Sequence, residues 1–275
     1  MERKEFGRTG AMVSEIGMGT WYDAAWLGAA KLGRASGAAE KVRALQAGMD
    51  GGINFIDTAE LYMSEPLVAK AIKGRGRDEL FVTTKVWSTH LHRDALVGAL
   101  EKSLKNLALS YVDLYQIHWP NPSVPIAETM AAMEEMKDKG RIRAIGVSNF
   151  SLEEMTEANS SLKKSEIASN QVNYSLRHRE PEGELLPYCE RNHVALIAYF
   201  PLGHGALASS SRLQAVADRV AKTPSQVALN WLVSKPAVFA IPRASNEAHV
   251  KEDLGASGWR LSEEDVAELD RQFPR

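Results

Sequence analysis

Four side chains that could take part in proton transfer occur in three segments of this 275-residue chain. Asp57 and Tyr62 lie in NFIDTAELY, Lys85 lies in FVTTKVW, and His118 lies in DLYQIHW. Each segment contains a short run of β-branched and apolar residues, and helix-like stretches separate the runs. This layout predicts that the four groups stand at the ends of three consecutive strands. In a parallel barrel the strand ends converge on one face, so the four groups can share one pocket.

A tyrosine, a lysine with a carboxylate partner and a histidine suit proton transfer to a carbonyl oxygen. The ordinary pKa of a phenol is about 10, and a nearby ammonium lowers it by favouring the tyrosinate. We therefore expect Lys85 to lower the pKa of Tyr62 and Asp57 to orient Lys85. A neutral His118 would donate a hydrogen bond to the carbonyl oxygen. Because no side chain supplies a hydride, this chemistry implies a nicotinamide cofactor.

Each of the four residues also has a purely structural interpretation. Asp57 and Lys85 could form a buried ion pair without a catalytic role. Tyr62 could be a half-buried core aromatic, and His118 could be a core histidine with satisfied hydrogen bonds. Their occurrence together at strand ends favours the catalytic interpretation.

Eight strand-like runs alternate with helix-like segments along the chain. The runs are mostly apolar, as in strands that are buried on both faces. An amphipathic segment carries Leu96, Leu100, Leu104 and Leu107 at helical spacing, and Ser151 with Glu154 forms a candidate capping box. The predicted strands are 14–21, 53–59, 80–86, 112–119, 144–150, 169–174, 195–200 and 237–244.

These eight units predict an α/β fold, a single (β/α)8 TIM barrel over residues 1–275, since such a barrel needs about 250 residues. An N-terminal β-hairpin that turns at 8–10 should precede it, and an amphipathic tail from Leu261 predicts an extra C-terminal helix. The irregular segment 24–37 is predicted to be a loop over the active face. No GxGxxG follows the first strand, which argues against a doubly wound sheet.

Composition limits the partners that we expect. The formal net charge is −2, which indicates no nucleic-acid partner. No CxxC or HExxH motif is present, and the single cysteine, Cys189, cannot form an internal disulfide, so no metal site is expected. Neither a signal-peptide core nor a run of about 18 apolar residues occurs. We expect a cytoplasmic protein with no membrane partner, a monomer or a weak homo-oligomer.

Six motifs, in this order, closely resemble the aldo-keto reductase family: NFIDTAELY, VTTKVW, YQIHWP, GVSNF, NQVNYS and AYFPLG. The opening FGRTGAMVSEIGMGTW is also similar to the start of that family, so the resemblance spans essentially the whole chain. It implies a (β/α)8 barrel that binds NADPH without a Rossmann motif and reduces aldehydes or ketones. It also implies that Tyr62 is the proton donor, that Asp57 and Lys85 tune it, and that His118 orients the carbonyl.

The same resemblance implies contacts with the cofactor and the substrate. Ser148, Asn149 and Gln171 would hydrogen-bond the nicotinamide carboxamide, and Tyr199 would stack on the nicotinamide ring. Further cofactor contacts are implied for Thr20, Trp21, Asp57, Phe200, Leu202, Gly203 and His204. An apolar substrate pocket would be formed by Trp21, Trp87, His118 and Trp119.

The last predicted strand departs most from the family pattern of a phosphate-binding Pro-Lys-Ser followed five residues later by Arg. Here Arg243 stands at the Lys position, and His249 stands where the second Arg is expected. Glu252 keeps an acidic adenine contact, and Asp253 replaces the usual Asn. Because Arg243 can pair bidentately with a phosphate, NADPH is favoured, while use of NADH stays open.

Two other functions stay open at this point. A buried Lys85 could be the nucleophile of a Schiff-base aldolase, or the chain could be a nucleotide-sensing regulatory subunit. The substrate is not identified: small aliphatic, aromatic or sugar-derived aldehydes and α-dicarbonyls are all candidates.

Overall fold

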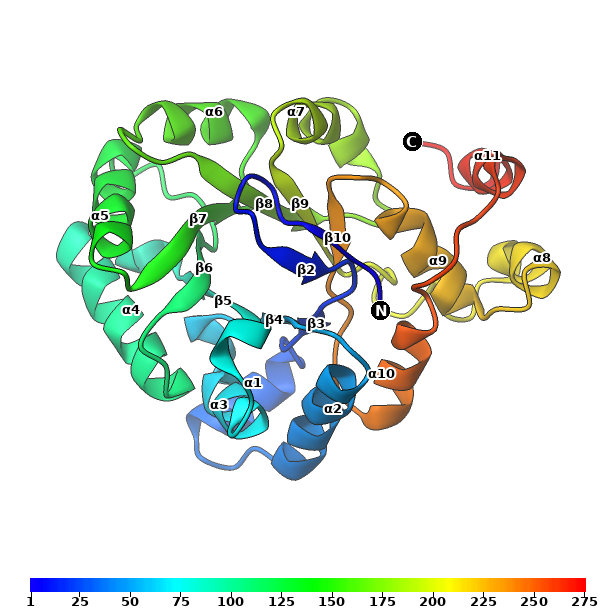
Figure 1. Cartoon of the computed structure of the whole chain (residues 1–275), viewed down its shortest axis with the longest axis horizontal. Helices are drawn as coiled ribbons and strands as arrows, with labels where there is room; N and C mark the ends of the chain where they lie inside the picture. The colour runs from blue at the N-terminus through cyan, green and yellow to red at the C-terminus, as the bar shows by residue number, and fades with distance from the viewer.

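The computed structural model describes residues 1–275 as an α/β barrel (Figure 1). Eight strands, β3 to β10, form one sheet in sequence order, and each neighbouring pair is parallel. Bridges of Ile16 to Ala240 and of Gly19 to Arg243 close the sheet between its first and last strands. The strands are β3 (Met18–Gly19), β4 (Phe55–Asp57), β5 (Phe81–Val86), β6 (Val112–Ile117), β7 (Ile142–Ser148), β8 (Ile167–Asn173), β9 (Ala195–Tyr199) and β10 (Val238–Ala240). The predicted barrel and its eight strands are confirmed.

The surrounding helices bury their apolar sides against this sheet. In α4 the residues Leu96, Leu100, Leu104 and Leu107 are all buried, as their spacing predicts. The predicted capping box is present at the start of α6, where Ser151 and Glu154 satisfy each other's backbone N–H groups. The helices are α2 (Ala38–Asp50), α3 (Glu65–Ile72), α4 (Arg93–Leu107), α5 (Ile126–Asp138), α6 (Leu152–Ser160), α7 (Leu185–Arg191), α8 (Ser211–Arg219), α9 (Pro224–Val233), α10 (Glu247–Leu254) and α11 (Glu263–Gln272).

The predicted N-terminal hairpin is β1 (Arg3–Glu5) paired with β2 (Met12–Ser14), and it covers one end of the barrel (Figure 1). Phe6 follows β1 and is fully buried. Its ring lies 5.8 Å from Phe55, 4.7 Å from Phe81 and 4.8 Å from Phe239, measured between ring centroids. This aromatic cluster fills the N-terminal end of the barrel, so a ligand cavity has room only at the opposite end.

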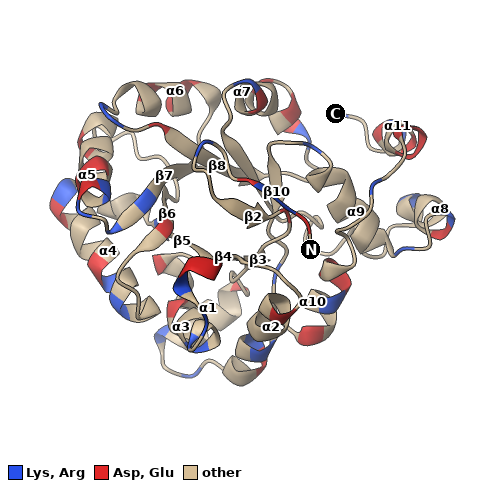
Figure 2. Ribbon diagram, in the orientation of Figure 1, with Lys and Arg blue, Asp and Glu red and all other residues tan.

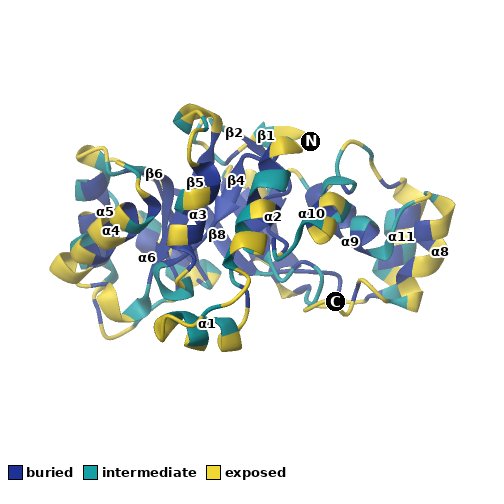
Figure 3. Cartoon of the chain, turned by 90° about the horizontal axis from the view of Figure 1, so that it is seen from below, coloured by how far each residue is buried: buried dark blue, intermediate teal, exposed yellow.

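The prediction of a loop over residues 24–37 is wrong for its first part, because α1 (Ala24–Lys31) is helical. Asp23 caps this helix by accepting a hydrogen bond from the Trp26 N–H at 2.6 Å. Four of its eight residues, AAWLGAAK, are alanine, which has the highest helix propensity. Figure 3 shows α1 on the side of the barrel opposite the hairpin, where the carboxyl ends of the strands lie.

The predicted C-terminal helix is α11, which packs against α8. Arg219 of α8 forms ion pairs with Asp265 and Glu268 of α11. Lys and Arg alternate with Asp and Glu over the outer helices, without a surface of one sign in the view of Figure 2. A helix with the length and apolarity required to cross a membrane does not occur in the chain.

Candidate active site

A cavity of about 680 Å³ opens at the carboxyl ends of the barrel strands. Such a volume is typical of small-molecule sites. The cavity lies where the strand-end argument predicts, and it brings together residues from β3, β4, β7, β8 and β9 and from the loops after β6 and β10. Predicted site residues that line it are Trp21, Asp57, Tyr62, Trp87, His118, Trp119, Ser148, Asn149, Gln171, Tyr199, Phe200, Leu202, His204, Arg243, His249, Glu252 and Asp253.

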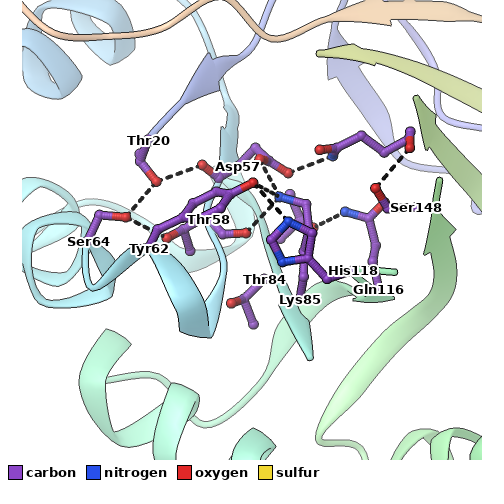
Figure 4. Close-up of polar contacts among 12 residues, drawn as sticks. Thr20, Asp57, Thr58, Tyr62, Ser64, Thr84, Lys85, Gln116, His118 and Ser148 are labelled. Atoms are coloured by element: carbon purple, nitrogen blue, oxygen red, sulfur yellow. Dashed lines mark hydrogen bonds and ion pairs between the residues drawn. The ribbon is translucent and has the colours of Figure 1, made fainter. Parts of the chain in front are cut away.

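Asp57, at the end of β4, and Lys85, on β5, form a fully buried ion pair with 2.6 Å between Oδ2 and Nζ (Figure 4). Lys85 also donates to the Thr58 carbonyl at 3.0 Å. Burial raises the pKa of Asp57 and lowers the pKa of Lys85, and the attraction between the two groups opposes both shifts. Neither group has access to water, so each charge is stabilised mainly by the other.

Tyr62 ends a short 3₁₀ turn, Glu60–Tyr62, that follows β4. Its hydroxyl lies 3.4 Å from Lys85 Nζ and 3.3 Å from His118 Nε2. The expected lowering of the Tyr62 pKa is not found: burial raises that pKa well above its ordinary value, and Asp57 and Tyr199 add to the rise. The negative charge of Asp57 offsets that of the ammonium, so the phenol stays protonated and available as a proton donor.

His118 follows β6 and is almost completely buried. Burial, together with the positive charge of Lys85, lowers the pKa of His118 to about 3. The imidazole is therefore neutral near pH 7, as the sequence predicts, and its Nδ1 has no hydrogen-bond partner. The ring packs edge-on against Tyr62 and Trp87, with centroid distances of 5.3 and 5.2 Å. These contacts fix the direction in which Nε2 faces.

Side chains of β7, β8 and β9 form a hydrogen-bonded group beside the ion pair. Tyr199 donates from its hydroxyl to Asn149 Oδ1 at 2.8 Å, and Asn149 Nδ2 donates to the His118 carbonyl at 3.0 Å. Ser148 donates to the Gln171 carbonyl at 2.9 Å. Gln171 in turn donates from Nε2 to Asp57 Oδ1 at 2.9 Å, a contact that its sequence position does not reveal. This group offers amide and hydroxyl functions to a planar amide-bearing ligand.

The far end of the cavity suits an anion. Arg243 lines it and donates from Nη1 to the Tyr22 carbonyl at 2.5 Å. The backbone N–H of His249 is bound by Asn246, which caps α10, so the positive end of that helix dipole also lies here. Asp253 is buried, and desolvation, with Glu252 nearby, raises its pKa well above the ordinary value. A neutral carboxyl group at this place would not repel a phosphate.

The other end of the cavity is aromatic. The ring centroid of Trp21 lies 5.2 Å from that of Tyr62, and Trp87 and Trp119 complete the wall. The backbone N–H of Trp87 donates to Glu60, which joins the loop after β5 to the turn that carries Tyr62. An apolar wall around a tyrosine hydroxyl and an imidazole excludes water from a bound carbonyl.

Two predicted cofactor residues do not line the cavity. Thr20 is fully buried. Its hydroxyl donates to the Asp57 carbonyl at 2.9 Å and lies 2.8 Å from the Ser64 hydroxyl. Gly203 has a positive φ of 55°, and a side chain there would meet Arg177 rather than the cavity. Lys85 also lies beneath the surface and reaches the cavity only through Tyr62.

The cavity contains residues that the sequence interpretation missed, including Gly19, Tyr22, Asp23, Leu61, Ala208, Ser225, Ile241 and Pro242. The strand-end rule could have found Gly19 and Ile241, because Gly19 ends β3 and Ile241 follows β10. Ser225 lies in the first turn of α9, so only the tertiary structure brings it to this place.

The arrangement combines a protonated phenol, a buried ion pair that contacts it and a neutral imidazole at one point of the cavity. These groups can donate a proton and a hydrogen bond to one oxygen atom. The amide group beside them and the anion-binding end lie in the same cavity, which fits a nicotinamide dinucleotide phosphate. No group of three or more His, Cys, Asp or Glu side chains is placed to hold a metal ion.

Comparisons with known proteins agree with this chemistry. The model of the Aldo/keto reductase family matches residues 15–272. The methylglyoxal reductase YeaE of Escherichia coli is 35% identical over 268 residues, which cover 94% of this chain and 90% of that protein.

Two solved structures share both the fold and the sequence. A thermostable aldo-keto reductase in complex with the inhibitor epalrestat has a TM-score of 0.90 and 41% identity, with 98% of this chain and 99% of that one covered. An aldo/keto reductase of Klebsiella pneumoniae in complex with NADP and acetate has a TM-score of 0.89 and 35% identity, with 100% and 96% covered. This chain therefore belongs to the aldo/keto reductase family and is an NAD(P)H-dependent reductase of carbonyl compounds.

Proposed function

We propose that this enzyme reduces small aldehydes and 2-oxoaldehydes, with NADPH as the preferred hydride donor and Tyr62 as the proton donor. The observation that carries the proposal is the position of the Tyr62 hydroxyl, 3.4 Å from Lys85 Nζ and 3.3 Å from His118 Nε2, at the aromatic end of the cavity. The substrate class is supported by the similarity to a methylglyoxal reductase.

The protein groups would act on the carbonyl oxygen. His118, neutral, donates a hydrogen bond from Nε2 and holds the oxygen near Tyr62. As negative charge develops on that oxygen, Tyr62 delivers its proton, and the ammonium of Lys85 stabilises the tyrosinate that is left. Asp57 keeps the ammonium oriented. The nicotinamide cofactor supplies the hydride.

Residues for holding the cofactor divide into two groups. Ser148, Asn149 and Gln171 would hold the carboxamide, and Tyr199 would support the nicotinamide ring. Arg243, with the start of α10, would hold the adenosine 2′-phosphate, which NADH lacks. This preference for NADPH is supported by the NADP bound in the Klebsiella pneumoniae relative.

The position of Lys85 makes the Schiff-base alternative less favourable. Its side chain is fully buried and its Nζ bonds Asp57 and the Thr58 carbonyl, so a substrate carbonyl has no path to it. A regulatory subunit without turnover would differ from the proposed enzyme in its oxidation of NADPH. It would bind NADPH but oxidise none in the presence of aldehydes.

The test is cofactor oxidation, followed at 340 nm, with methylglyoxal, glyceraldehyde, benzaldehyde and succinic semialdehyde, and with NADPH and NADH in parallel. We expect turnover of methylglyoxal with NADPH and its loss in Tyr62→Phe. NADPH binding without oxidation for any of these carbonyls would overturn the proposal.

A further inference from the structure

Tyr62 lies on a short turn that few backbone hydrogen bonds hold. The 3₁₀ turn Glu60–Tyr62 has no side-chain cap, and its one backbone hydrogen bond runs from the Tyr62 N–H to the Ala59 carbonyl at 3.0 Å. The next residue, Met63, has a φ of 59°, which residues other than glycine seldom adopt. The position of the Tyr62 ring therefore depends on the contacts that anchor this turn to its neighbours.

Glu60 anchors the turn to the loop after β5. Its side chain is 14% exposed. Oε1 accepts a hydrogen bond from the backbone N–H of Trp87, and His90 Nδ1 lies 3.0 Å from Oε1 and 3.2 Å from Oε2. Because a carboxylate only accepts hydrogen bonds, Nδ1 carries the proton here. On the other side of Tyr62, the Ser64 hydroxyl lies 3.0 Å from that of Thr58.

The bond to the Trp87 N–H connects the two sides of the proposed carbonyl position. On one side, Tyr62 follows Glu60 by two residues in the same turn. On the other side, the ring of Trp87 packs edge-on against His118, with 5.2 Å between the ring centroids. The Tyr62 hydroxyl and His118 Nε2 lie 3.3 Å apart (Figure 4). Glu60 thus links the turn of the proton donor directly to the residue that packs on the imidazole.

Glu128 of α5 repeats this set of contacts at a distance from the catalytic groups. It accepts a hydrogen bond from the backbone N–H of Arg93 at 3.1 Å, and both of its carboxylate oxygens lie 3.2 Å from His92 Nδ1. None of these three residues lines the cavity. The two glutamates therefore have partners of the same chemistry, and only Glu60 has Tyr62 and His118 beside it.

We propose that Glu60 is a positioning residue of this reductase, which sets the separation of the Tyr62 hydroxyl from the His118 imidazole by holding the Trp87 N–H. Glu60 itself does not line the cavity, so it acts through these neighbours. The role depends on the reach of its side chain and not on its charge, because the Trp87 N–H requires only an acceptor oxygen. This inference rests on the proposed function, in which Tyr62 and His118 act on one oxygen atom.

Two conservative substitutions separate reach from charge. Glu60→Gln keeps the length of the side chain and an acceptor oxygen but removes the charge. Glu60→Asp keeps the charge but is one methylene shorter, so its oxygens should no longer reach the Trp87 N–H. Glu128→Asp is the matched control, since it shortens the equivalent carboxylate away from Tyr62.

The measurement is the rate of NADPH oxidation by methylglyoxal in a single turnover, which leaves out product release. Glu60→Asp should lower this rate about tenfold to a hundredfold, because rates fall steeply when reacting groups are misplaced. Glu60→Gln should stay within about threefold of the unmodified enzyme, and Glu128→Asp within about twofold. The Kd of NADPH should change less than about twofold in every variant, because Glu60 and Glu128 lie outside the cavity.

A normal single-turnover rate in Glu60→Asp would overturn the proposal, and so would an equal loss of rate in Glu60→Gln or in Glu128→Asp. Unfolding of Glu60→Asp at the assay temperature, followed by circular dichroism, would show a structural role and would also overturn it. Absence of turnover in the unmodified enzyme, or near-normal turnover in Tyr62→Phe, would instead refute the proposed function, and the positioning role with it.

Discussion

Gln171 donates a hydrogen bond from Nε2 to Oδ1 of Asp57 at 2.9 Å, while the other carboxylate oxygen, Oδ2, accepts from Lys85 at 2.6 Å. The contact spans the barrel from β8 to β4 and joins residues 114 positions apart. It links the amide group beside the ion pair to the ion pair itself. Gln171 is therefore placed to hold Asp57 in the orientation that Lys85 needs.

Replacement of Gln171 should test this link. In Gln171→Leu, Asp57 Oδ1 loses its donor inside the protein, which costs about 1–3 kcal/mol and disturbs the position of Lys85. We expect kcat with methylglyoxal to fall at least severalfold. Gln116→Leu is the control, because Gln116 is equally buried but bonds Thr83 and Ser169 rather than Asp57. Similar losses of kcat in both variants would show that the effect is merely structural.

The rate of the chemical step should depend strongly on the hydroxyl of Tyr62. Tyr62→Phe removes only the proton donor, so kcat should fall by about 10²–10⁴-fold while the Kd of NADPH changes little. Tyr22→Phe is a matched control, since the Tyr22 hydroxyl is also buried near the cavity but has no hydrogen-bond partner. Near-normal turnover in Tyr62→Phe would exclude this residue as the donor.

Loss of Lys85 should affect stability and activity separately. Lys85→Met leaves the Asp57 carboxylate buried without its partner, and we expect the free energy of unfolding to drop by about 3–5 kcal/mol. The double variant Lys85→Met with Asp57→Leu removes both charges and should regain most of that stability. It should not regain kcat, because nothing then stabilises the tyrosinate. Denaturant unfolding and steady-state rates of the three proteins check this, and recovery of kcat would contradict it.

The low pKa of His118 predicts how stability depends on pH. In the folded protein this pKa is about 3, whereas the ordinary value is 6.5, so the unfolded chain binds a proton that the folded chain does not. Stability should therefore fall as pH decreases from about 6.5 towards 3. In His118→Asn that contribution is absent, and the loss between pH 7.5 and pH 5 should be smaller. Urea unfolding at the two pH values measures the difference, and equal losses would argue against a neutral, buried imidazole.

Cofactor preference should depend on Arg243. One charge-assisted contact with the 2′-phosphate contributes about 1.5–3 kcal/mol, so Arg243→Ala should weaken NADPH binding about ten- to a hundredfold. NADH binding is the internal control and should change far less. His249→Arg adds a cation at the start of α10 and should strengthen the preference. Equal Kd values for NADPH and NADH in the unmodified protein at low salt would refute the assignment.

The sequence alone determined the barrel and the composition of the proposed catalytic set. Apolar runs that alternate with amphipathic segments specify strands buried on both faces, and polar residues directly after such runs must gather at one end. That reasoning placed Asp57, Tyr62 and His118 in one cavity. Local signals were sufficient for the capping box of α6 and for α11, because each depends on residues only a few positions apart.

Only the tertiary structure decided properties that depend on burial and on distant neighbours. The pKa of Tyr62 is raised rather than lowered, because the depth of the pocket and the pairing of Lys85 with Asp57 outweigh the ammonium charge, and sequence spacing carries neither quantity. The same holds for the Gln171–Asp57 contact and for the hydroxyl of Thr20, which bonds the Asp57 carbonyl and Ser64 and does not face the cavity. Each arises from side-chain packing between elements far apart in the chain, which residue type and periodicity do not encode.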